Sequence, residues 1–161
     1  MPDESLLLLA KEVRGKTLRI LDNVTEQQAL FAPPGLHNTI LWHAGHSLIV
    51  VEHLGVSPAT GRPAIYPKDW FDKFSWESQP ATVKQWPTLT EVKAKLIDQA
   101  ERLTAAIQLL TEQQLSQTIG DPTKPRNLRW SIFHGLHDEA GHQGEMWLLK
   151  KLQTKAGGQG R

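Results

Sequence analysis

Cysteine is absent from the 161 residues of this chain, and so are long apolar runs. Without cysteine the chain can have no disulfide framework, no thiolate metal site and no cysteine nucleophile. Any metal site must therefore use nitrogen and oxygen ligands, which leaves histidine, aspartate and glutamate. The longest apolar run, residues 6–10, is far too short to cross a bilayer.

An excess of either charge is also absent, because 18 basic and 17 acidic residues give a net charge of +1. No block of five or more basic residues is present. The sequence therefore does not indicate nucleic acid or a membrane surface as a partner. Asp3 and Glu4 give the start of the chain the wrong charge for a signal peptide. We expect a cytoplasmic protein.

Three well-known catalytic motifs are missing from the sequence. No Gly-x-Ser-x-Gly segment is present, so a serine nucleophile on a sharp strand-to-helix turn finds no support. The glycines near the C-terminus follow no strand and precede no helix, which excludes a glycine-rich phosphate loop. The zinc-protease motif His-Glu-x-x-His does not occur either, so we do not expect a metalloprotease.

Amphipathic helices account for most of the pattern that is present. Apolar residues recur at helical spacing in residues 6–21, 40–53, 92–110 and 128–152. Good caps precede two of these stretches: Asn38 or Thr39 before the second, and the capping box of Thr88 and Glu91 before the third. No run alternates with period two for long enough to form a strand. The pattern predicts an all-α fold, a four-helix bundle.

An irregular insert separates the second and third predicted helices. Gly55 and Pro58 should end the second helix, and residues 56–87 are rich in proline and aromatic residues. So long a stretch without periodicity is unusual in a compact domain unless it packs or functions. Its aromatic side chains either cover one end of the bundle or form a lid or wall over a site. A short helical turn is expected near residues 68–73.

The chain is predicted to form a single domain over residues 1–153. Its length and its ordinary composition, 39% apolar and 22% charged, are sufficient for a hydrophobic core. Three glycines near the C-terminus predict that residues 154–161 form a flexible tail.

Polar residues gather on one face of the last predicted helix. At about 100° per residue, His134, Asp138, His142 and Glu145 fall within a sector of about 80°. Leucines near the end of the helix share this face, so we expect it to point inward. Burying imidazoles and carboxylates costs several kcal/mol each unless they are paired or bind a cation. The face therefore predicts a metal site.

Asp138 and His142 are the expected ligands on this helix, because side chains four residues apart can converge on one ion. The second helix offers His43, His46 and His53 for a third ligand. We choose His46, which lies mid-helix beside a glycine that lets a neighbouring backbone approach closely. His43 and His53 are candidates for supporting the ligands. The alternative is that all of these are core histidines and capping carboxylates without a metal.

Two segments of the chain resemble the DinB-like superfamily, which includes the YfiT-like metal-dependent hydrolases. They are NTILWHAGHSLIVVEHL from Asn38 and HGLHDEAGHQGEMWLL from His134. The most specific features are Trp-x-x-Gly-His in the first and His-x-Gly-Glu in the second. The resemblance implies an up-down-down-up four-helix bundle, usually a homodimer. It also implies a divalent ion, often nickel or zinc, on three side chains of the second and last long helices.

Carried over by position, the resemblance implies His46 and His142 as ligands and places the middle ligand on Asp138. Many members of the superfamily have a second histidine at that position, so this chain departs from the commonest pattern. A carboxylate binds the ion more strongly and lowers its Lewis acidity. Glu139 is a rival for the same position.

Three ligands on two helices leave open coordination positions, which is typical of a catalytic site. The resemblance implies a small-molecule substrate and either hydrolysis or transfer of a low-molecular-weight cellular thiol to an electrophile. Glu145 or His134 would then shuttle a proton or orient a ligand. Two alternatives stay open: a metal-binding stress or sensor protein without turnover, and a helical interaction protein without metal.

Overall fold

Helices make up most of the fold in the computed structural model, which describes residues 1–158 and side chains as far as residue 154. Residues 159–161 of the predicted tail lie outside the described residues. The helices are α1 (Glu4–Asp22), α2 (Glu26–Ala29), α3 (Ile40–Val51), the π-helix η1 (Glu52–Val56), α4 (Ser57–Thr60), α5 (Trp70–Phe74), the 3-10 helix η2 (Pro80–Thr82), α6 (Leu89–Leu109), α7 (Glu112–Leu115) and α8 (Leu128–Gly158). The all-α prediction is confirmed.

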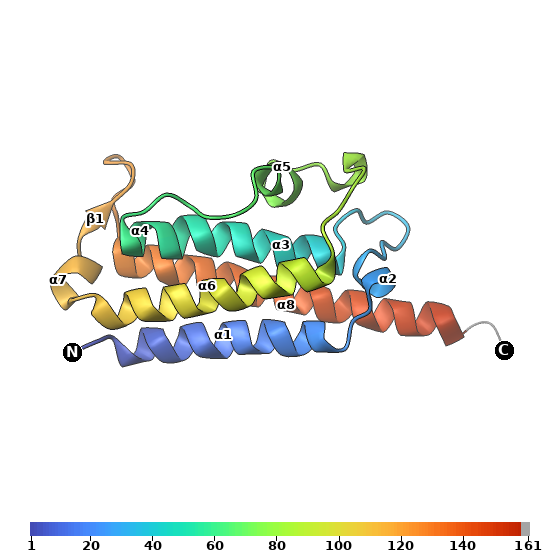
Figure 1. The fold of residues 1–161 in the computed structure, drawn as a ribbon, viewed down its shortest axis with the longest axis horizontal. Coiled ribbons are helices and arrows are strands. Elements are labelled where there is room, and N and C mark those ends of the chain that lie inside the picture. Colours follow the sequence, from blue (N-terminus) through green and yellow to red (C-terminus); the bar gives the residue numbers. More distant parts are fainter. Residues whose placement is uncertain (159–161) are drawn as a thin grey trace.

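The long helices lie side by side along the molecule (Figure 1). Within residues 4–158, α1 contacts α6 and α8, and α3 also contacts α6 and α8. In Figure 1, α1 and α8 run in one direction and α3 and α6 in the other, which is the expected up-down-down-up order. Among the described residues, no helix combines the length and apolarity needed to cross a bilayer.

The predicted helix starts are confirmed at α3 and α6. The side chain of Thr39 accepts a hydrogen bond from the backbone N–H of Trp42, which caps α3. Thr88 and Glu91 form the expected capping box at the start of α6. In each case the cap satisfies a backbone donor that the first turn of a helix leaves without a partner.

The second long helix does not end at Gly55, as the sequence predicted. It widens into η1, continues as α4 and ends at Gly61, whose φ of 65° gives the left-handed conformation common after a helix. Pro58 is the second residue of α4, directly after the π-helical turn, and the chain stays helical through it.

Two features of the last third of the chain were not predicted. The strands β1 (Thr118–Ile119) and β2 (Arg126–Asn127) pair in antiparallel fashion. Strands of two residues are too short to show a period in the sequence. The last helix begins at Leu128, as expected, but continues past the predicted end at Leu152 as far as Gly158.

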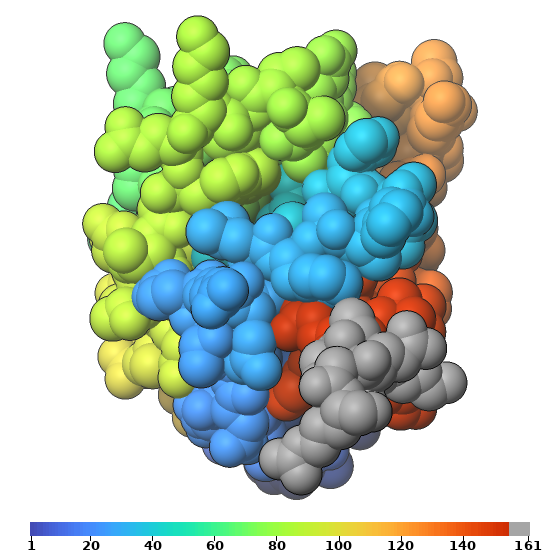
Figure 2. All heavy atoms as spheres, turned by 90° about the vertical axis from the view of Figure 1, so that its right-hand side faces the viewer, coloured from blue at the N-terminus to red at the C-terminus, as the bar shows by residue number. Residues whose placement is uncertain are grey.

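The insert packs on α3 through its short helix α5 (Figure 1). Phe74 is fully buried, and the indole N–H of Trp42 donates to Ser78 Oγ at 2.9 Å. Figure 2 views the end of the molecule where the insert, drawn in green, meets the cyan chain between α2 and α3. The insert therefore covers the part of α3 that carries the candidate ligand His46.

A buried ion pair joins α1 to α8 inside the fold. The guanidinium of Arg14 lies 2.9 Å from a carboxylate oxygen of Glu139, and both side chains are buried. Thr17 Oγ1 donates to the same oxygen at 2.6 Å, and Arg14 also donates to Gln99. Because each charge has a charged partner and further hydrogen bonds, the burial of Glu139 is explained without a metal.

Candidate metal centre

The contact between α3 and α8 brings together the three predicted ligands, His46, Asp138 and His142. One ligand atom of each lies within 4.8 Å of the other two. Asp138 Oδ2 is 3.7 Å from His46 Nε2 and 3.5 Å from His142 Nε2. Atoms bonded to one tetrahedral zinc ion at about 2.0–2.2 Å are about 3.3–3.6 Å apart. The spacing of these atoms therefore suits a metal ion.

The orientation of His46 is fixed by the insert. His46 Nδ1 lies 2.7 Å from the backbone carbonyl oxygen of Phe74. A carbonyl oxygen can only accept, so Nδ1 carries the proton and Nε2 keeps its lone pair, which faces Asp138. The indole of Trp42 stacks on the imidazole with ring centroids 4.6 Å apart. Both contacts hold the ring with its free nitrogen toward the site.

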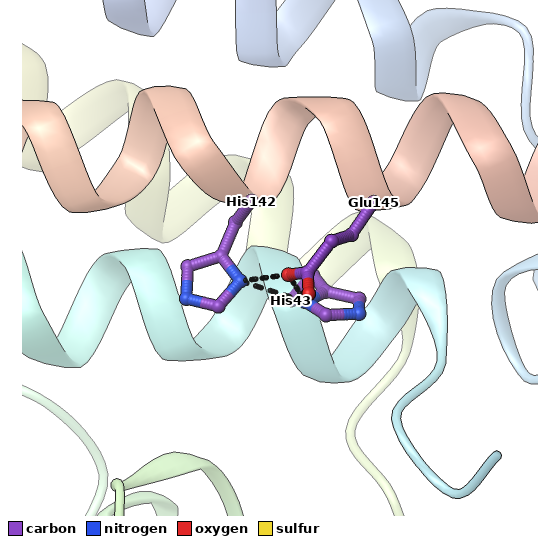
Figure 3. Close-up of side chains that lie close together, drawn as sticks. All are labelled: His43, His142 and Glu145. Carbon is purple, nitrogen blue, oxygen red and sulfur yellow. Dashed lines mark hydrogen bonds and ion pairs between the residues drawn. The ribbon is translucent and has the colours of Figure 1, made fainter.

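His142 is oriented in the same way by Glu145. Its Nδ1 lies 2.7 Å from Glu145 Oε2, one of the dashed contacts in Figure 3. When Nδ1 donates to the carboxylate, Nε2 presents a lone pair toward Asp138. A carboxylate or carbonyl on the far nitrogen is the usual support of a metal-binding histidine. Both histidines of the site have this support.

Asp138 Oδ2 is a buried acceptor with no hydrogen-bond partner among the described residues. Its two nearest polar neighbours are the Nε2 atoms of His46 and His142, which are lone-pair atoms in the orientation described above. When both imidazoles are neutral, three acceptors face one another without a donor, which is unfavourable because each has lost water and gained no hydrogen bond. A cation between them would remove this cost. The donor set therefore fits a divalent metal ion.

The charge states of the three ligands follow from their surroundings. Burial lowers the pKa of His46, and the bond to the Phe74 carbonyl offsets only part of this effect. Burial also acts to lower the pKa of His142, but its interactions with Asp138 and Glu145 raise the pKa by more. For Asp138, burial acts upward and the nearby histidines lower the pKa by more. In the metal-free protein, His142 therefore holds a proton most readily.

A second group overlaps the first through the other nitrogen of His142. His43 Nδ1 lies 2.8 Å from His142 Nδ1 and 3.1 Å from Glu145 Oε2 (Figure 3). The contact between the two Nδ1 atoms is a hydrogen bond in which one nitrogen donates and the other accepts, whereas the contact of His43 with Glu145 is only an ion-pair distance. Burial, reinforced by nearby histidines, lowers the pKa of His43 to about 3, so its ring is neutral at pH 7. We interpret this group as support for His142.

Other candidates from the sequence lie outside the ligand group. The imidazole of His134 is exposed and stacks on Trp130 at 4.6 Å, although it is near enough to Asp138 to help lower the pKa of that carboxyl. His53 Nε2 is 2.7 Å from the hydroxyl of Tyr66 in the insert. Glu139 is paired with Arg14, so it does not replace Asp138.

One residue of the site, Phe74, was missed in the sequence. A Cβ added at Gly45 would lie 2.3 Å from the Phe74 ring. The sequence predicted a close approach at this glycine but expected a backbone there, whereas an aromatic ring fills the space. The same residue supplies the carbonyl that orients His46. A carbonyl has no sequence signal, so only the glycine pointed to this contact.

The fold and the site together define a class: an all-α protein with a histidine and carboxylate site between two of its long helices. The chain belongs to the DinB superfamily, whose sequence model matches residues 9–146. The fold is similar to that of a conserved protein from Enterococcus faecalis, with a TM-score of 0.71 and 16% sequence identity over 94% of this chain and 97% of that chain. No curated protein matches the sequence.

Proposed function

We propose that this protein is a divalent-metal-dependent enzyme that acts on a small molecule, with the ion on His46, Asp138 and His142. The observation that carries the proposal is the buried Asp138 Oδ2, which has no partner in the described part of the chain and faces two imidazole nitrogens. Membership of the DinB superfamily supports it. Two nitrogens and one oxygen suit nickel or zinc better than magnesium or calcium, which prefer oxygen ligands.

The residues around the site have distinct roles in this proposal. When bound, the ion supplies Lewis acidity that activates water or a thiol as a nucleophile. Glu145 and the Phe74 carbonyl hold the proton on the far nitrogen of each imidazole, which keeps both Nε2 lone pairs free. Glu145 is thus a positioning residue. His134, which is exposed and close to Asp138, is the group placed to exchange a proton with solvent.

Hydrolysis and thiol transfer are the two reactions that fit this chemistry. Zinc-loaded and nickel-loaded protein is incubated with a simple ester, and separately with a cellular thiol and a small electrophile. We expect metal-dependent loss of either the ester or the thiol. His46→Ala should abolish it, whereas His137→Ala, which removes an exposed imidazole from α8, should not. Equal activity of the two variants would contradict the proposal.

A metal-binding protein without turnover is the second candidate. One observation favours it. The cavity of about 410 Å³ next to the site is lined by His43 and Glu145 but not by His46 or Asp138, so a molecule in this cavity would not reach these two ligands of the ion. This candidate would be favoured over the enzyme if the protein bound one equivalent of metal but consumed neither the ester nor the thiol when loaded with zinc or with nickel.

We also propose that the protein forms a homodimer through the outer face of α8. Phe133 and Trp147 are about half exposed. Of the two carboxylates in residues 130–144 of α8, Glu139 is buried and Asp138 is one-third exposed and directed toward His46 on α3. The two aromatic residues are equally far from Ala140 along the helix. A second copy running antiparallel would place Phe133 against the partner copy's Trp147, which satisfies twofold symmetry.

A further inference from the structure

A cavity of about 410 Å³ lies beside the metal centre, on the side of His142 away from Asp138. The chain between α2 and α3 forms one wall, and α3 and α8 form the others. Its lining residues are Gly35, Leu36, His37, Asn38, His43, Glu145, Leu148 and Leu149. Figure 2 looks at this end of the molecule, where the cyan segment meets the red end of α8. The volume is within the range of small-molecule sites, about 300–1,000 Å³.

A single proton on His142 sets the hydrogen bonding at the polar end of this cavity. His142 Nδ1 lies 2.7 Å from Glu145 Oε2 and 2.8 Å from His43 Nδ1. The carboxylate can only accept, so His142 Nδ1 carries the proton. His43 Nδ1 must then accept in its own contact with this nitrogen, because two N–H groups that face each other repel. An ion on His142 Nε2 leaves this arrangement unchanged.

His43 therefore offers a donor to the cavity, because an imidazole with a bare Nδ1 carries its proton on Nε2. In Figure 3 the Nε2 side of the His43 ring is turned away from His142. Nothing in residues 1–154 makes a hydrogen bond with this N–H, although His43 is only 3% exposed. Among the described side chains that are not exposed, only Asp138 Oδ2 is both fully enclosed and without a partner. His43 Nε2 is thus not fully enclosed and lies at the cavity that His43 lines.

Glu145 offers an acceptor beside this donor. Its side chain is 55% exposed, and its Oε2 lies 3.1 Å from His43 Nδ1. Its other oxygen, Oε1, receives no hydrogen bond from any described residue. The polar end of the cavity therefore presents one N–H donor and one charged acceptor to a ligand.

The rest of the lining is largely apolar, with Leu36, Leu148 and Leu149 around the polar end. Leu36 and Leu148 are about half exposed, so apolar surface is open to solvent at this point. A ligand that fits needs an apolar body and a head group with an acceptor next to a donor. We propose that this cavity binds a small primary amide, with its carbonyl oxygen on His43 Nε2–H and its N–H on Glu145 Oε1.

A primary amide matches this pair of groups better than a charged head group does. Its carbonyl oxygen and one of its N–H groups lie on the same side of the head, so both can be used at once. A carboxylate accepts from His43 but is repelled by Glu145. An ammonium group donates to Glu145 but leaves the N–H of His43 without an acceptor, which costs the water that this group has lost.

This site goes beyond the proposed function, because the amide would not touch the ion. The imidazole of His142 stands between them: its Nδ1 faces Glu145 and its Nε2 faces Asp138. The donor on His43 and the acceptor on Glu145 do not depend on an ion. The amide should therefore bind to metal-free protein.

The test is a titration of metal-free protein with hexanamide, followed by NMR through the methyl signals of Leu148 and Leu149. We expect saturable shifts at these methyls. Hexanoate and hexylamine, which keep the apolar chain and change the head group, should bind at least about fivefold more weakly. Absence of saturable shifts, or binding of either compound as tightly as hexanamide, would overturn the proposal.

Nitrogen-15 NMR of the imidazole rings tests the donor itself. His43 should show a protonated Nε2 and a bare Nδ1, and hexanamide should shift the signal of the Nε2–H group. The opposite tautomer, with a bare Nε2, would overturn the proposal because the carbonyl would then have no donor.

Glu145→Gln supplies the matched variant, because it keeps the shape and removes the charge. It should weaken hexanamide binding by at least about threefold and strengthen hexanoate binding, since the repulsion is gone. Glu101→Gln, which removes an exposed carboxylate from α6, should change neither. An unchanged preference for hexanamide in Glu145→Gln would reject the site. Repeating the titration with zinc separates the two proposals, because failure of zinc to bind would leave the amide shifts intact.

Discussion

Asp138 has the least favourable surroundings of any carboxylate in the site, and its replacement by asparagine tests the reason. In the metal-free protein the Asp138→Asn amide can donate to an imidazole nitrogen, which the carboxylate cannot do. At a pH above the pKa of His142, where its imidazole is neutral, we expect metal-free stability to rise by about 1 kcal/mol, because an unsatisfied buried acceptor is removed. Zinc affinity should fall at least about 100-fold, because the charge is lost. Thermal melts with a chelator and with zinc measure both effects.

A fall in metal-free stability together with unchanged zinc affinity would contradict this account of Asp138. It would mean that the carboxylate has a partner in solution and that the ion, if bound, is held elsewhere.

The titration of His142 predicts how zinc binding depends on pH. The pKa of His142 is raised in the metal-free protein, while those of His46 and Asp138 are lowered, so His142 is the ligand that must release a proton. Zinc affinity should therefore be constant above the pKa of His142. Below that pKa it should fall by about tenfold per pH unit, which corresponds to one proton.

Competition titrations against a chelating dye at a series of pH values measure this slope. His142→Ala should remove both the tight binding and the slope. A slope of two protons would show that His46 is also protonated in the metal-free state, which would contradict the orientation given by the Phe74 carbonyl.

At the scale of elements, the packing of the insert on α3 sets the position of His46. Gly45→Ala would place a Cβ 2.3 Å from the ring of Phe74. Because the Phe74 ring is fully buried, we expect its displacement to shift the Phe74 backbone, whose carbonyl orients His46. Overpacking of this kind costs about 1–3 kcal/mol. We expect lower stability and weaker zinc binding together, measured by urea unfolding and zinc competition.

Gly15→Ala is the matched control for this change. A Cβ at Gly15 on α1 would meet only the end of the Arg19 side chain, at 3.4 Å. The variant should be neutral or slightly stabilising, since alanine has the higher helix propensity. If Gly45→Ala were equally neutral, the ring contact would not position His46.

The elements also show what could be predicted from the sequence and what could not. Helix starts at Thr39 and Thr88 were predicted because capping is local: the residues that decide it are three apart. The continuation through Pro58 was missed because it depends on a π-helical turn. Periodicity on α8 predicted a shared face for Asp138 and His142. It could not reveal the partner of His46, a carbonyl 28 residues away.

At the scale of the whole molecule, the exposed aromatic face of α8 predicts a dimer in solution. A dimer would have twice the chain mass of 18.1 kDa. Phe133→Glu should give a monomer, because it buries a charge at the proposed interface. Leu109→Glu, at an exposed leucine of α6, should remain dimeric. Sedimentation velocity measures the mass; a monomeric parent protein or a dimeric Phe133→Glu would contradict the prediction.

The most direct test of the metal centre is an anomalous difference map at the zinc edge from crystals grown with zinc. Our account predicts a peak about 2.0–2.2 Å from His46 Nε2, Asp138 Oδ2 and His142 Nε2. A peak between His43, His142 and Glu145, or the absence of any peak at Asp138, would contradict it.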